Sequence, residues 1–411
     1  METNRQETIP QGYKATALGV IPQEWEVKCI KDFGPVITGS TPPTFDSENY
    51  GGSYMFVSPA DLSEDKKYIT TTEKTLTDKG FSQARKIPKG SVLFTCIGST
   101  IGKVGIASQD LATNQQINAV ITDGEYLFYV LSLHSDRIRI LANEQAVPII
   151  NKSDFERIKL AVPPLGEQRK IAEVLGVWDL AIAKQVQLVE RLTQRKRALM
   201  QRLLTAKLRL PGFSAPWKKV HYSDILKEVR RTLTWDENEL YDLISVRRRS
   251  GGVFHRESLY GYEIKTKTLR PALEGDFLIS KMQIVHGASG VVPKHLSGMK
   301  ISGSYIALIA KDPKKLNINY FNLWSQMPLF YHQTFVSSYG VHIEKMTFDL
   351  DAFMSLSMNL PPIEEQNRIV EVISTATDEI ELAQAKLELY RRQKRGLMQQ
   401  LLTGKKRIPY L

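Results

Sequence analysis

The sequence predicts an α+β fold: two mixed α/β bodies separated by two long helices that form an antiparallel coiled coil, as a pseudo-two-fold tandem repeat. Two observations lead to this prediction. First, residues 163–211 recur as residues 361–409, with 20 of 49 positions identical and no gap, where chance would give roughly three identities. Second, both copies carry a stripe of apolar side chains at helical spacing. A repeat of this quality makes the chain two half-molecules in tandem.

The repeat divides the chain into five parts. We predict an N-terminal extension over 1–15, a first body over 16–162, a first long helix over 163–211, a second body over 212–360 and a second long helix over 361–411. Apart from a similar opening strand and one similar turn, the two bodies share little sequence. Similar helices that carry different bodies indicate one scaffold that presents two different specificities.

Both bodies are expected to be rich in strands. In the first body, residues 24–30 alternate in polarity, and residues 91–97 form a β-rich run behind a Pro-Lys-Gly turn. In the second body, residues 217–220 and 274–280 take the corresponding places. Short β-rich runs bounded by Gly and Pro are typical of strands.

Each long helix is expected to begin after a short strand, residues 158–162 or 356–360, that ends at two prolines. Two prolines cannot continue a strand ladder, whereas a proline suits the first turn of a helix. Acidic residues follow where the helix dipole favours them: Glu167 in the first copy, Glu364 and Glu365 in the second. The helices therefore begin directly after the Pro-Pro pairs.

Both helical segments then show one narrow apolar stripe with a period of about 3.5 residues, which indicates a coiled-coil seam. The seam residues of the first helix are Ile171, Leu175, Trp178, Ile182, Val189, Leu192, Lys196, Leu199 and Leu203. Those of the second helix are Ile369, Ile373, Ile380, Leu387, Tyr390, Lys394, Leu397 and Leu401. About 40 residues make a helix of roughly 60 Å. Neither helix can bury its stripe alone, so we expect them to pack on each other, antiparallel because the halves are equivalent. The alternative is that each packs into its own body.

Lys196 and Lys394 occupy equivalent positions in the two seams. Their stems could pack while the ammonium groups reach water, or they could sit favourably near the helix C-termini. They could also form a basic surface that faces phosphate or a partner subunit. The sequence leaves these three readings open.

Composition is that of a folded protein with two or three domains: 411 residues, 42% hydrophobic and 24% charged. There is no apolar run near the roughly 20 residues that a membrane helix needs, and the first residues lack a signal-peptide pattern. The two cysteines, Cys29 and Cys96, lack metal-ligand spacing. We therefore expect a reducing, cytoplasmic location.

The net charge of +11 favours nucleic acid as a partner, but the charge is uneven. Residues 1–160 sum to −2, whereas residues 161–211 carry +6 and residues 212–360 carry +5. A basic average is weak support by itself, because runs of charge are commonly solvated faces.

The chain shows no catalytic constellation and no metal-binding pattern. The segment from Gly98 to Val104 resembles a phosphate-binding loop, but it has three residues between its glycines where four are required, and Val104 stands where Ser or Thr would bind magnesium. Asp242 with Glu263 and Lys265 imitates a nuclease site, a pattern that is common by chance; a strand with alternating charges explains it better. The chain is predicted to be a binder and not an enzyme.

The remaining signal lies in polar and basic residues of glycine-rich loops in the bodies. Arg, Lys, Asn and Gln read base edges in the major groove because their hydrogen-bonding groups match guanine or adenine. The DNA-binding candidates of the first body are Lys86, Lys89, Ser99, Thr100, Lys103, Asn114, Gln115 and Gln116. Those of the second body are Arg247, Arg248, Arg249, His255, Arg256, Lys281, Gln283 and His286. The three arginines beside a Gly-Gly pair are the best of these, and the alternative for every candidate is an ordinary loop residue.

Two variable bodies, each followed by a Pro-Pro-(apolar)-x-Glu-Gln-x-(Arg/Lys)-Ile helix that ends in Leu-Met-Gln-x-Leu-Leu-Thr, resemble the specificity (S) subunit of type I restriction-modification enzymes. The resemblance covers the whole chain. It implies that each body is a target recognition domain that reads one half of a bipartite double-stranded DNA sequence, with the helices as a spacer that fixes the unread gap. It also implies that the helices dock two methyltransferase subunits, and that two motor-nuclease subunits complete the restriction complex.

The resemblance places the chemistry in those partners. No cofactor or metal is expected in this chain; S-adenosylmethionine, ATP and magnesium are expected in the partner subunits. The neutral first body suggests that the assembled complex supplies much of the affinity while base contacts supply selectivity. Two alternatives stay open: a self-contained nuclease or methyltransferase, and a DNA-specificity adaptor of a methylation-only or other phage-defence system.

Overall fold

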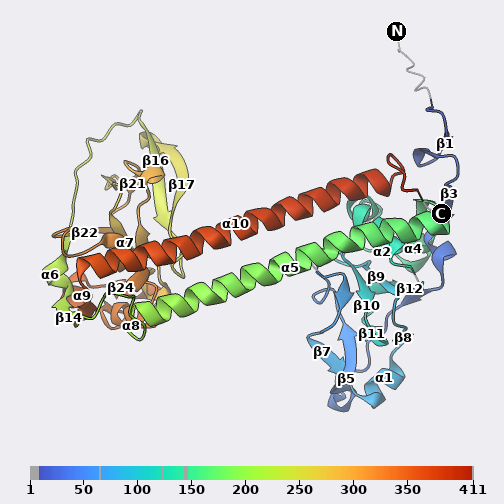
Figure 1. The fold of residues 1–411 in the computed structure, drawn as a ribbon, viewed down its shortest axis with the longest axis horizontal. Helices are drawn as coiled ribbons and strands as arrows, with labels where there is room; N and C mark the ends of the chain where they lie inside the picture. The colour runs from blue at the N-terminus through green and yellow to red at the C-terminus, as the bar shows by residue number, and fades with distance from the viewer. Residues whose placement is uncertain (1–8, 64–65, 123, 143–146, 410–411) are drawn as a thin grey trace, which may run out of the picture. The chain divides into compact units, whose positions relative to one another are not determined.

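The chain divides into two compact units (Figure 1). Unit 1 comprises residues 1–189 and 382–411, and unit 2 comprises residues 190–381. Each unit contains one body, the beginning of one long helix and the end of the other. None of the helices in the described part of the chain is long and apolar enough to cross a membrane. The residues that this computed structural model describes are 9–63, 66–122, 124–142 and 147–409.

The body of unit 1 is built on two sheets. The first has the strand order β4 (Val36–Thr38), β12 (Ile117–Val120), β9 (Val92–Thr95), β10 (Val104–Ala107) and β6 (Tyr68–Ile69). The second has the order β7 (Lys74–Leu76), β5 (Tyr50–Val57), β11 (Leu111–Thr113) and β8 (Lys86–Ile87). Leu93 and Ala119 of the first sheet pack on the second sheet, while Val92 and Phe94 pack on the helix α2 (Tyr126–Leu133). The first sheet is therefore the central layer, buried on both faces.

The body of unit 2 has the same layers. Its first sheet has the order β15 (Leu226–Glu228), β22 (Tyr305–Ala310), β19 (Phe277–Ser280) and β20 (Ser289–Val291). Its second sheet has the order β17 (Val253–Tyr260), β16 (Leu240–Val246), β21 (Lys300–Ile301) and β18 (Arg270–Pro271). Leu278 packs toward the second sheet, and Phe277 packs toward the helices.

The two bodies share one topology although their sequences differ. Strands β4, β12, β9 and β10 correspond in order to β15, β22, β19 and β20, and the second sheets correspond strand by strand. Each second sheet contains one parallel pair, β5 with β11 and β16 with β21. The edge strand β6 is an addition in unit 1: within the described residues of unit 2, the matching sheet ends at β20. The predicted mixed α/β bodies are confirmed.

Shorter elements connect these sheets to the long helices. In unit 1 they are β1 (Tyr13–Thr16), β2 (Gly19–Pro22), β3 (Glu26–Cys29), α1 (Asp78–Gln83), α3 (Ser135–Arg139), α4 (Lys152–Glu156) and β13 (Lys159–Val162). In unit 2 they are β14 (Lys218–His221), α6 (Tyr222–Ile225), α7 (Ile318–Trp324), α8 (Pro328–Val336), β23 (Ser338–Tyr339), β24 (Thr347–Phe348), α9 (Leu350–Met354) and β25 (Ser357–Leu360). The strand before each Pro-Pro pair is completed by the strand that opens its body: β13 pairs with β3, and β25 pairs with β14.

The N-terminal extension predicted over residues 1–15 is partly ordered structure. Strand β1 forms an antiparallel hairpin with β2, so this element crosses the predicted boundary at residue 15. The Tyr13 hydroxyl donates a hydrogen bond to the Gly404 carbonyl at 2.9 Å, which joins the hairpin to the C-terminal segment of the same unit. Residues 1–8 of the extension lie outside the described residues.

The structural repeat begins earlier than the sequence repeat. Asn151 caps α4 by accepting a hydrogen bond from the Asp154 amide, and Asp349, 198 residues later, caps α9 in the same way. Phe155 and Phe353 follow at equivalent positions, and both are fully buried. Capping oxygens and one buried ring per helix are enough to preserve this element while almost every other residue changes.

Both long helices begin directly after their Pro-Pro pairs, as predicted. In unit 1 the beginning of one helix packs on the end of the other, because Ile171 and Leu401 share one buried cluster. In unit 2 the end of the first long helix packs on the beginning of the second, because Leu203 and Ile369 share one buried cluster. The pairing is antiparallel in both units, so the predicted antiparallel coiled coil is confirmed. The two helices are α5 (Leu165–Leu203) and α10 (Ile363–Leu401), each of 39 residues.

The predicted seam faces inward along both helices, since every seam residue is buried or half-buried. Trp178 and Tyr390 meet edge to face with ring centroids 5.8 Å apart. The Gln185 amide donates a hydrogen bond to the Ala383 carbonyl at 2.9 Å. Positions 185 and 383 are 198 residues apart, so this contact joins equivalent positions of the repeat.

An ion pair joins the beginning of α5 to the segment that follows α10 in unit 1. The fully buried Glu167 carboxylate accepts two hydrogen bonds from the Arg407 guanidinium, at 2.7 and 2.9 Å. It also accepts one from the Trp25 indole at 3.0 Å. We call Glu167, Arg407 and Trp25 the unit 1 clasp. It joins the first body, the start of α5 and the segment after α10 at one carboxylate.

Unit 2 contains the same arrangement with the helices exchanged. The Glu365 carboxylate, 1% exposed, accepts hydrogen bonds from Arg209 at 2.7 and 2.9 Å and from the Trp217 indole at 3.0 Å. We call Glu365, Arg209 and Trp217 the unit 2 clasp. Both the Glu and the Arg are identical between the repeats, and the clasps give the physical reason: a bidentate pair satisfies a carboxylate that would otherwise be buried without partners.

Candidate nucleic-acid interface

Three segments of the first body meet beside the ends of its sheet strands. The Lys103 ammonium, in the loop between β9 and β10, donates a hydrogen bond to the Pro59 carbonyl after β5 at 2.9 Å. The Asn114 amide, in the loop between β11 and β12, donates to the Val57 carbonyl at 3.0 Å. The residues that share this first loop surface are Ser99, Thr100, Lys103, Asn114, Gln115 and Gln116. Six of the eight candidates of the first body therefore belong to one place.

The amide side chains of the first loop surface are held in fixed orientations. The Asn114 side-chain amide donates to Gln116 Oε1 at 2.9 Å, and the Gln116 backbone amide donates to Asn114 Oδ1 at 3.1 Å. The exposed Gln115 accepts a hydrogen bond from the Thr41 hydroxyl at 2.6 Å. Amides whose rotamers are fixed in advance lose little conformational entropy when they bind.

Lys86 and Lys89 do not join that surface. Lys86 lies in β8 opposite Ala112, with its ammonium 5.3 Å from the centre of the Phe81 ring. The Lys89 backbone amide donates to the Asp110 carboxylate at 2.9 Å. Asp110 precedes β11 whereas the amide loop follows it, so Lys89 lies toward the opposite end of the strand.

The second body gathers its candidates in the same way. The loop between β16 and β17 is joined to the loop between β19 and β20: the Arg249 amide donates to the His286 carbonyl at 2.7 Å, and the Ser250 amide donates to the Gly287 carbonyl at 2.9 Å. The Lys281 amide donates to the Ser304 carbonyl at 2.9 Å, which adds the loop between β21 and β22. The candidates on this second loop surface are Arg247, Arg248, Arg249, Lys281, Gln283 and His286.

The arginine loop has an unusual backbone. Arg249 and Ser250 have φ values of 59° and 55°, the left-handed region that non-glycine residues seldom adopt. Such a residue costs of order 1–3 kcal/mol and persists where its surroundings hold it, often at functional sites. Here the hydrogen bonds to the neighbouring loop hold it. The Ser250 hydroxyl also lies 2.8 Å from the Tyr331 hydroxyl of α8.

All three arginines are exposed, and the Arg247 guanidinium stacks 4.1 Å from the centre of the Phe254 ring. Gly287 is required beneath this loop, because it has a φ of 72° and a Cβ there would stand 2.0 Å from the Tyr331 hydroxyl oxygen. The loop is therefore a built surface of exposed guanidinium groups.

His255 and Arg256 lie on β17 and are engaged within the strand pair. His255 Nε2 is 3.1 Å from the Ser258 hydroxyl, and Arg256 forms a 2.6 Å ion pair with its neighbour Glu257. Asp242, which imitates part of a nuclease site in the sequence, accepts a hydrogen bond from Ser258 in the same ladder. Asp242 lies in β16, but Glu263 ends a 3-10 helix (Gly261–Glu263) and Lys265 lies outside the strands, so the predicted strand with alternating charges does not form.

Sequence reasoning missed the residues that hold the loops together. Thr41, Pro59, Ser304 and Tyr331 contribute to the two surfaces, and two of them do so through backbone carbonyls alone. A backbone contact leaves no mark on residue type, so no local signal could have found Pro59 or Ser304.

The two seam lysines have different surroundings. The Lys394 ammonium forms a 2.5 Å ion pair with Asp179 of α5, within unit 1. Lys196 is half-buried in unit 2, and burial lowers its pKa. Because every seam residue is buried or half-buried, the more exposed residues of the helices are the better candidates for contact with a protein that docks there.

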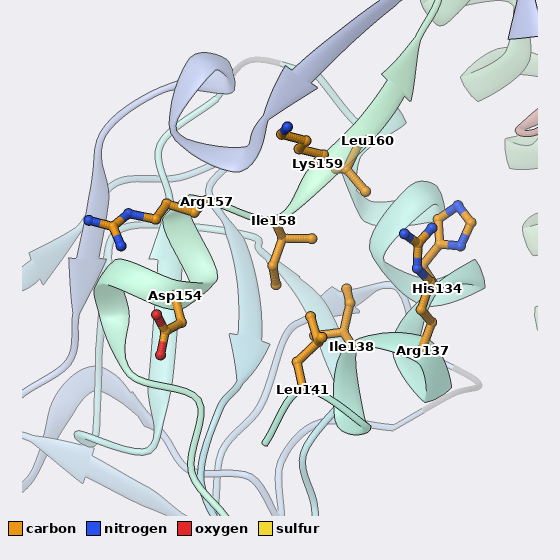
Figure 2. A pocket seen from close by; sticks show the side chains of 9 residues that line it. All are labelled: His134, Arg137, Ile138, Leu141, Asp154, Arg157, Ile158, Lys159 and Leu160. Atoms are coloured by element: carbon orange, nitrogen blue, oxygen red, sulfur yellow. The ribbon is translucent and has the colours of Figure 1, made fainter. Parts of the chain in front are cut away.

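A separate pocket of about 370 Å³ lies on the first body, lined from α3, α4, β13 and the residues that flank them (Figure 2). It combines apolar and basic side chains, and burial with the nearby Arg137 charge lowers the pKa of His134 at its edge. None of its lining residues belongs to the first loop surface. They are His134, Arg137, Ile138, Leu141, Asp154, Arg157, Ile158, Lys159 and Leu160.

The same domain model matches the chain twice. Residues 22–194 and 216–389 each match the type I restriction modification DNA specificity domain, which together is most of the chain. The chain belongs to this family. Its two bodies are recognition domains of a type I restriction-modification specificity subunit, and a specificity subunit is not itself an enzyme.

Individual relatives agree with this assignment. The chain is 25% identical to the type I restriction enzyme MjaVIII specificity subunit of Methanocaldococcus jannaschii over 427 aligned positions, 95% of each chain. It is 35% identical to the MjaIX specificity subunit of the same organism over 192 residues, so that match spans 44% of either chain.

Solved structures show the same fold. The S subunit of a type I system from M. genitalium has a TM-score of 0.56 at 12% identity and covers 92% of this chain and 96% of its own. A chain from a study of complex assembly and conformational transition in a type I system has a TM-score of 0.60 at 16% identity, covering 94% and 99%.

Proposed function

We propose that each recognition domain reads one half of a bipartite DNA target through its loop surface. The observation that carries this proposal is that two bodies of one topology build the same three-loop arrangement from different residues. A shared frame with variable loops is what two different half-sites require. Loops on a rigid scaffold are common places for recognition residues.

The chemistry of the two surfaces suggests different bases. Arginine fits the two acceptors of guanine in the major groove, and Asn or Gln fits the donor and acceptor of adenine. The second loop surface offers Arg247–Arg249, and the first offers Asn114, Gln115 and Gln116. We therefore expect guanine in the half-site of the second domain and adenine in that of the first.

The long helices would set the unread gap between the half-sites. Each is continuous over 39 residues and belongs to both units. A continuous helix pair makes the separation of two recognition domains a property of the protein. The expected docking of the domains is in major grooves about one helical turn, roughly 34 Å, apart.

Catalysis would come from partner subunits docked on the helices. We propose two methyltransferase subunits that bind S-adenosylmethionine, and two motor-nuclease subunits that use ATP and magnesium in the restriction complex. Exposed apolar side chains outside the seam are the candidate contacts, since their burial against a partner would be favourable. In unit 1 they are Val177, Leu180 and Leu188 of α5 and Leu382 and Leu389 of α10.

The test is to change one loop and read the methylated sequence. The variant Arg248→Ala/Arg249→Ala removes two exposed charges from the second loop surface; the control Lys218→Ala/Lys219→Ala removes two exposed charges from β14. Each is expressed with its methyltransferase, and methylated adenines are mapped across the genome. Loss or relaxation of one half-site in the loop variant, with both half-sites intact in the control, supports the proposal. Two unchanged half-sites in the loop variant would refute it.

A further inference from the structure

A buried group of charges in unit 1 lies outside both the clasp and the loop surface. Asp179 of α5 accepts a hydrogen bond from the Tyr129 hydroxyl of α2 and pairs with Lys394 of α10 at 2.5 Å. On the side of the body, the Lys67 ammonium lies 3.0 Å from the Tyr129 hydroxyl and 2.5 Å from Glu125. The charges of two lysines and two carboxylates thus compensate each other around one tyrosine.

Three of these charged groups are well shielded from water, whereas the Glu125 side chain is 37% exposed. The side chains of Lys67, Lys394 and Asp179 are 9%, 15% and 20% exposed. Both ammonium groups also stand over the Tyr129 ring, at 5.0 and 5.4 Å from its centre. Burial, together with the Asp179 charge, raises the pKa of Tyr129, so its hydroxyl remains a donor at neutral pH. Removing one member of such a group costs more than breaking a surface pair, because its partners stay buried.

Lys67 reaches this group because of the edge strand β6. It immediately precedes β6, which pairs in parallel with β10. The same connection, from β5 to β7, carries Pro59, whose carbonyl binds Lys103 on the first loop surface. One segment therefore touches both the candidate DNA-reading loops and the helix pair.

Unit 2 has no counterpart at the equivalent positions. Thr377 replaces Asp179, and its hydroxyl donates to the Ile373 carbonyl of its own helix. Lys196 replaces Lys394. Within the described residues of unit 2, the first sheet has no strand that corresponds to β6.

Within the described residues of unit 2, the side-chain hydrogen bonds between the second body and α10 lie near the start of that helix. The Gln366 side chain accepts a hydrogen bond from the Asn317 amide, and Asn367 accepts one from the Asn317 side chain. These contacts lie within a turn of the unit 2 clasp. In unit 1, Asp179 follows the clasp residue Glu167 by 12 positions, about 18 Å along the helix. Two polar attachments that far apart resist tilting of the body, whereas two adjacent ones act as a single pivot.

We propose that Lys67, Glu125, Tyr129, Asp179 and Lys394 form a brace that fixes the tilt of the first recognition domain on the helix pair and so narrows the range of gap lengths that the complex accepts. Asp179 is a positioning residue, since it contacts no part of the loop surface. The inference rests on the proposed function for its consequence at DNA, but the brace itself can be tested without DNA.

The first test measures the tilt. In the full-length Cys29→Ser chain, spin labels at Phe45→Cys on the body and Leu188→Cys on α5, both exposed, report a distance distribution within unit 1. Asp179→Thr, which copies the residue of the second repeat, and Lys67→Met, which leaves the helix-to-helix pair intact, should both broaden it. The control Thr377→Val changes the equivalent position of unit 2 and should leave it unchanged. Unbroadened distributions in both folded variants would overturn the brace.

The second test measures the gap. With the methyltransferase present, the Lys67→Met complex should keep both half-sites but raise methylation about tenfold at sites whose gap is one base pair shorter or longer, an effect that corresponds to a difference of about 1.4 kcal/mol. A broadened distance distribution with an unchanged gap would overturn the link to specificity. Failure of the wild-type complex to methylate any bipartite sequence would instead reject the proposed function and leave the spin-label result standing.

Discussion

The repeated glutamate explains, at the scale of single residues, why the motif after each Pro-Pro pair is preserved. Glu365→Gln keeps the shape of the side chain but leaves the Arg209 charge without its carboxylate. We expect unit 2 to lose about 3 kcal/mol of stability, because removing one member of a buried ion pair leaves the other charge buried without a partner. Urea unfolding followed by tryptophan fluorescence measures this, with the exposed neighbour Glu364→Gln as control. Equal midpoints for the two variants would show that the clasp is not structural.

Cys96 gives a residue-scale prediction about pH. Burial raises the pKa of its thiol to about 12, whereas an unfolded thiol titrates near 8.5. The folded state therefore keeps the proton that the unfolded state loses, and the stabilising contribution is complete below pH 8.5 and disappears as the pH rises toward 12. Between pH 8 and 10.5 the wild type should lose about 2 kcal/mol more than Cys96→Ala. Parallel pH profiles in urea titrations of the two proteins would contradict this.

At the scale of elements, the repeat allows the carboxylate of the Asp179–Lys394 ion pair to be introduced at the equivalent position of unit 2. Thr377→Asp places a carboxylate in unit 2 where Asp179 pairs with the seam lysine in unit 1. It should raise the pKa of the half-buried Lys196, which burial lowers, and stabilise unit 2 by up to about 1 kcal/mol, the range of partly exposed pairs. Thermal unfolding at low and high salt measures this against Thr375→Asp, which is exposed two residues earlier. Equal effects of both substitutions would show that the seam geometry is not transferable.

The elements also show what a sequence can and cannot reveal. The helices were predictable because their apolar period and Pro-Pro starts are local patterns. The common strand order of the bodies was not, since it depends on pairings such as β5 with β11 that leave no shared residues. Most of the loop candidates lie together on the two loop surfaces, because polar residues in the glycine-rich turns follow neighbouring buried strands. The roles of Arg209, Arg407 and Lys67 were missed because their partners lie 156, 240 and 62 positions away in the chain.

At the scale of the whole molecule, α5 and α10 connect the two recognition domains, because each helix belongs to both units. Each helix contributes its beginning to one unit and its end to the other, so each unit is completed by both halves of the chain. A change in one body should therefore leave the other body's clasp and loops intact. A change in the length of the helices should alter the distance between the two recognition domains and leave both loop surfaces unchanged.

Lengthening both helices isolates that separation. One heptad inserted after Val186 of α5 and one after Gln384 of α10, at equivalent positions of the repeat, would preserve the seam period and add roughly 10 Å to each helix. Since base pairs rise about 3.4 Å along DNA, the unread gap should grow by about three base pairs while both half-sites stay the same. Mapping methylated adenines in cells that express this variant with its methyltransferase measures the gap and both half-sites at once.

A heptad in α5 alone is the control: it displaces Arg209 and Arg407 relative to the glutamates of their clasps and should abolish methylation. An unchanged gap with altered half-sites would mean that the helices do not set the spacing.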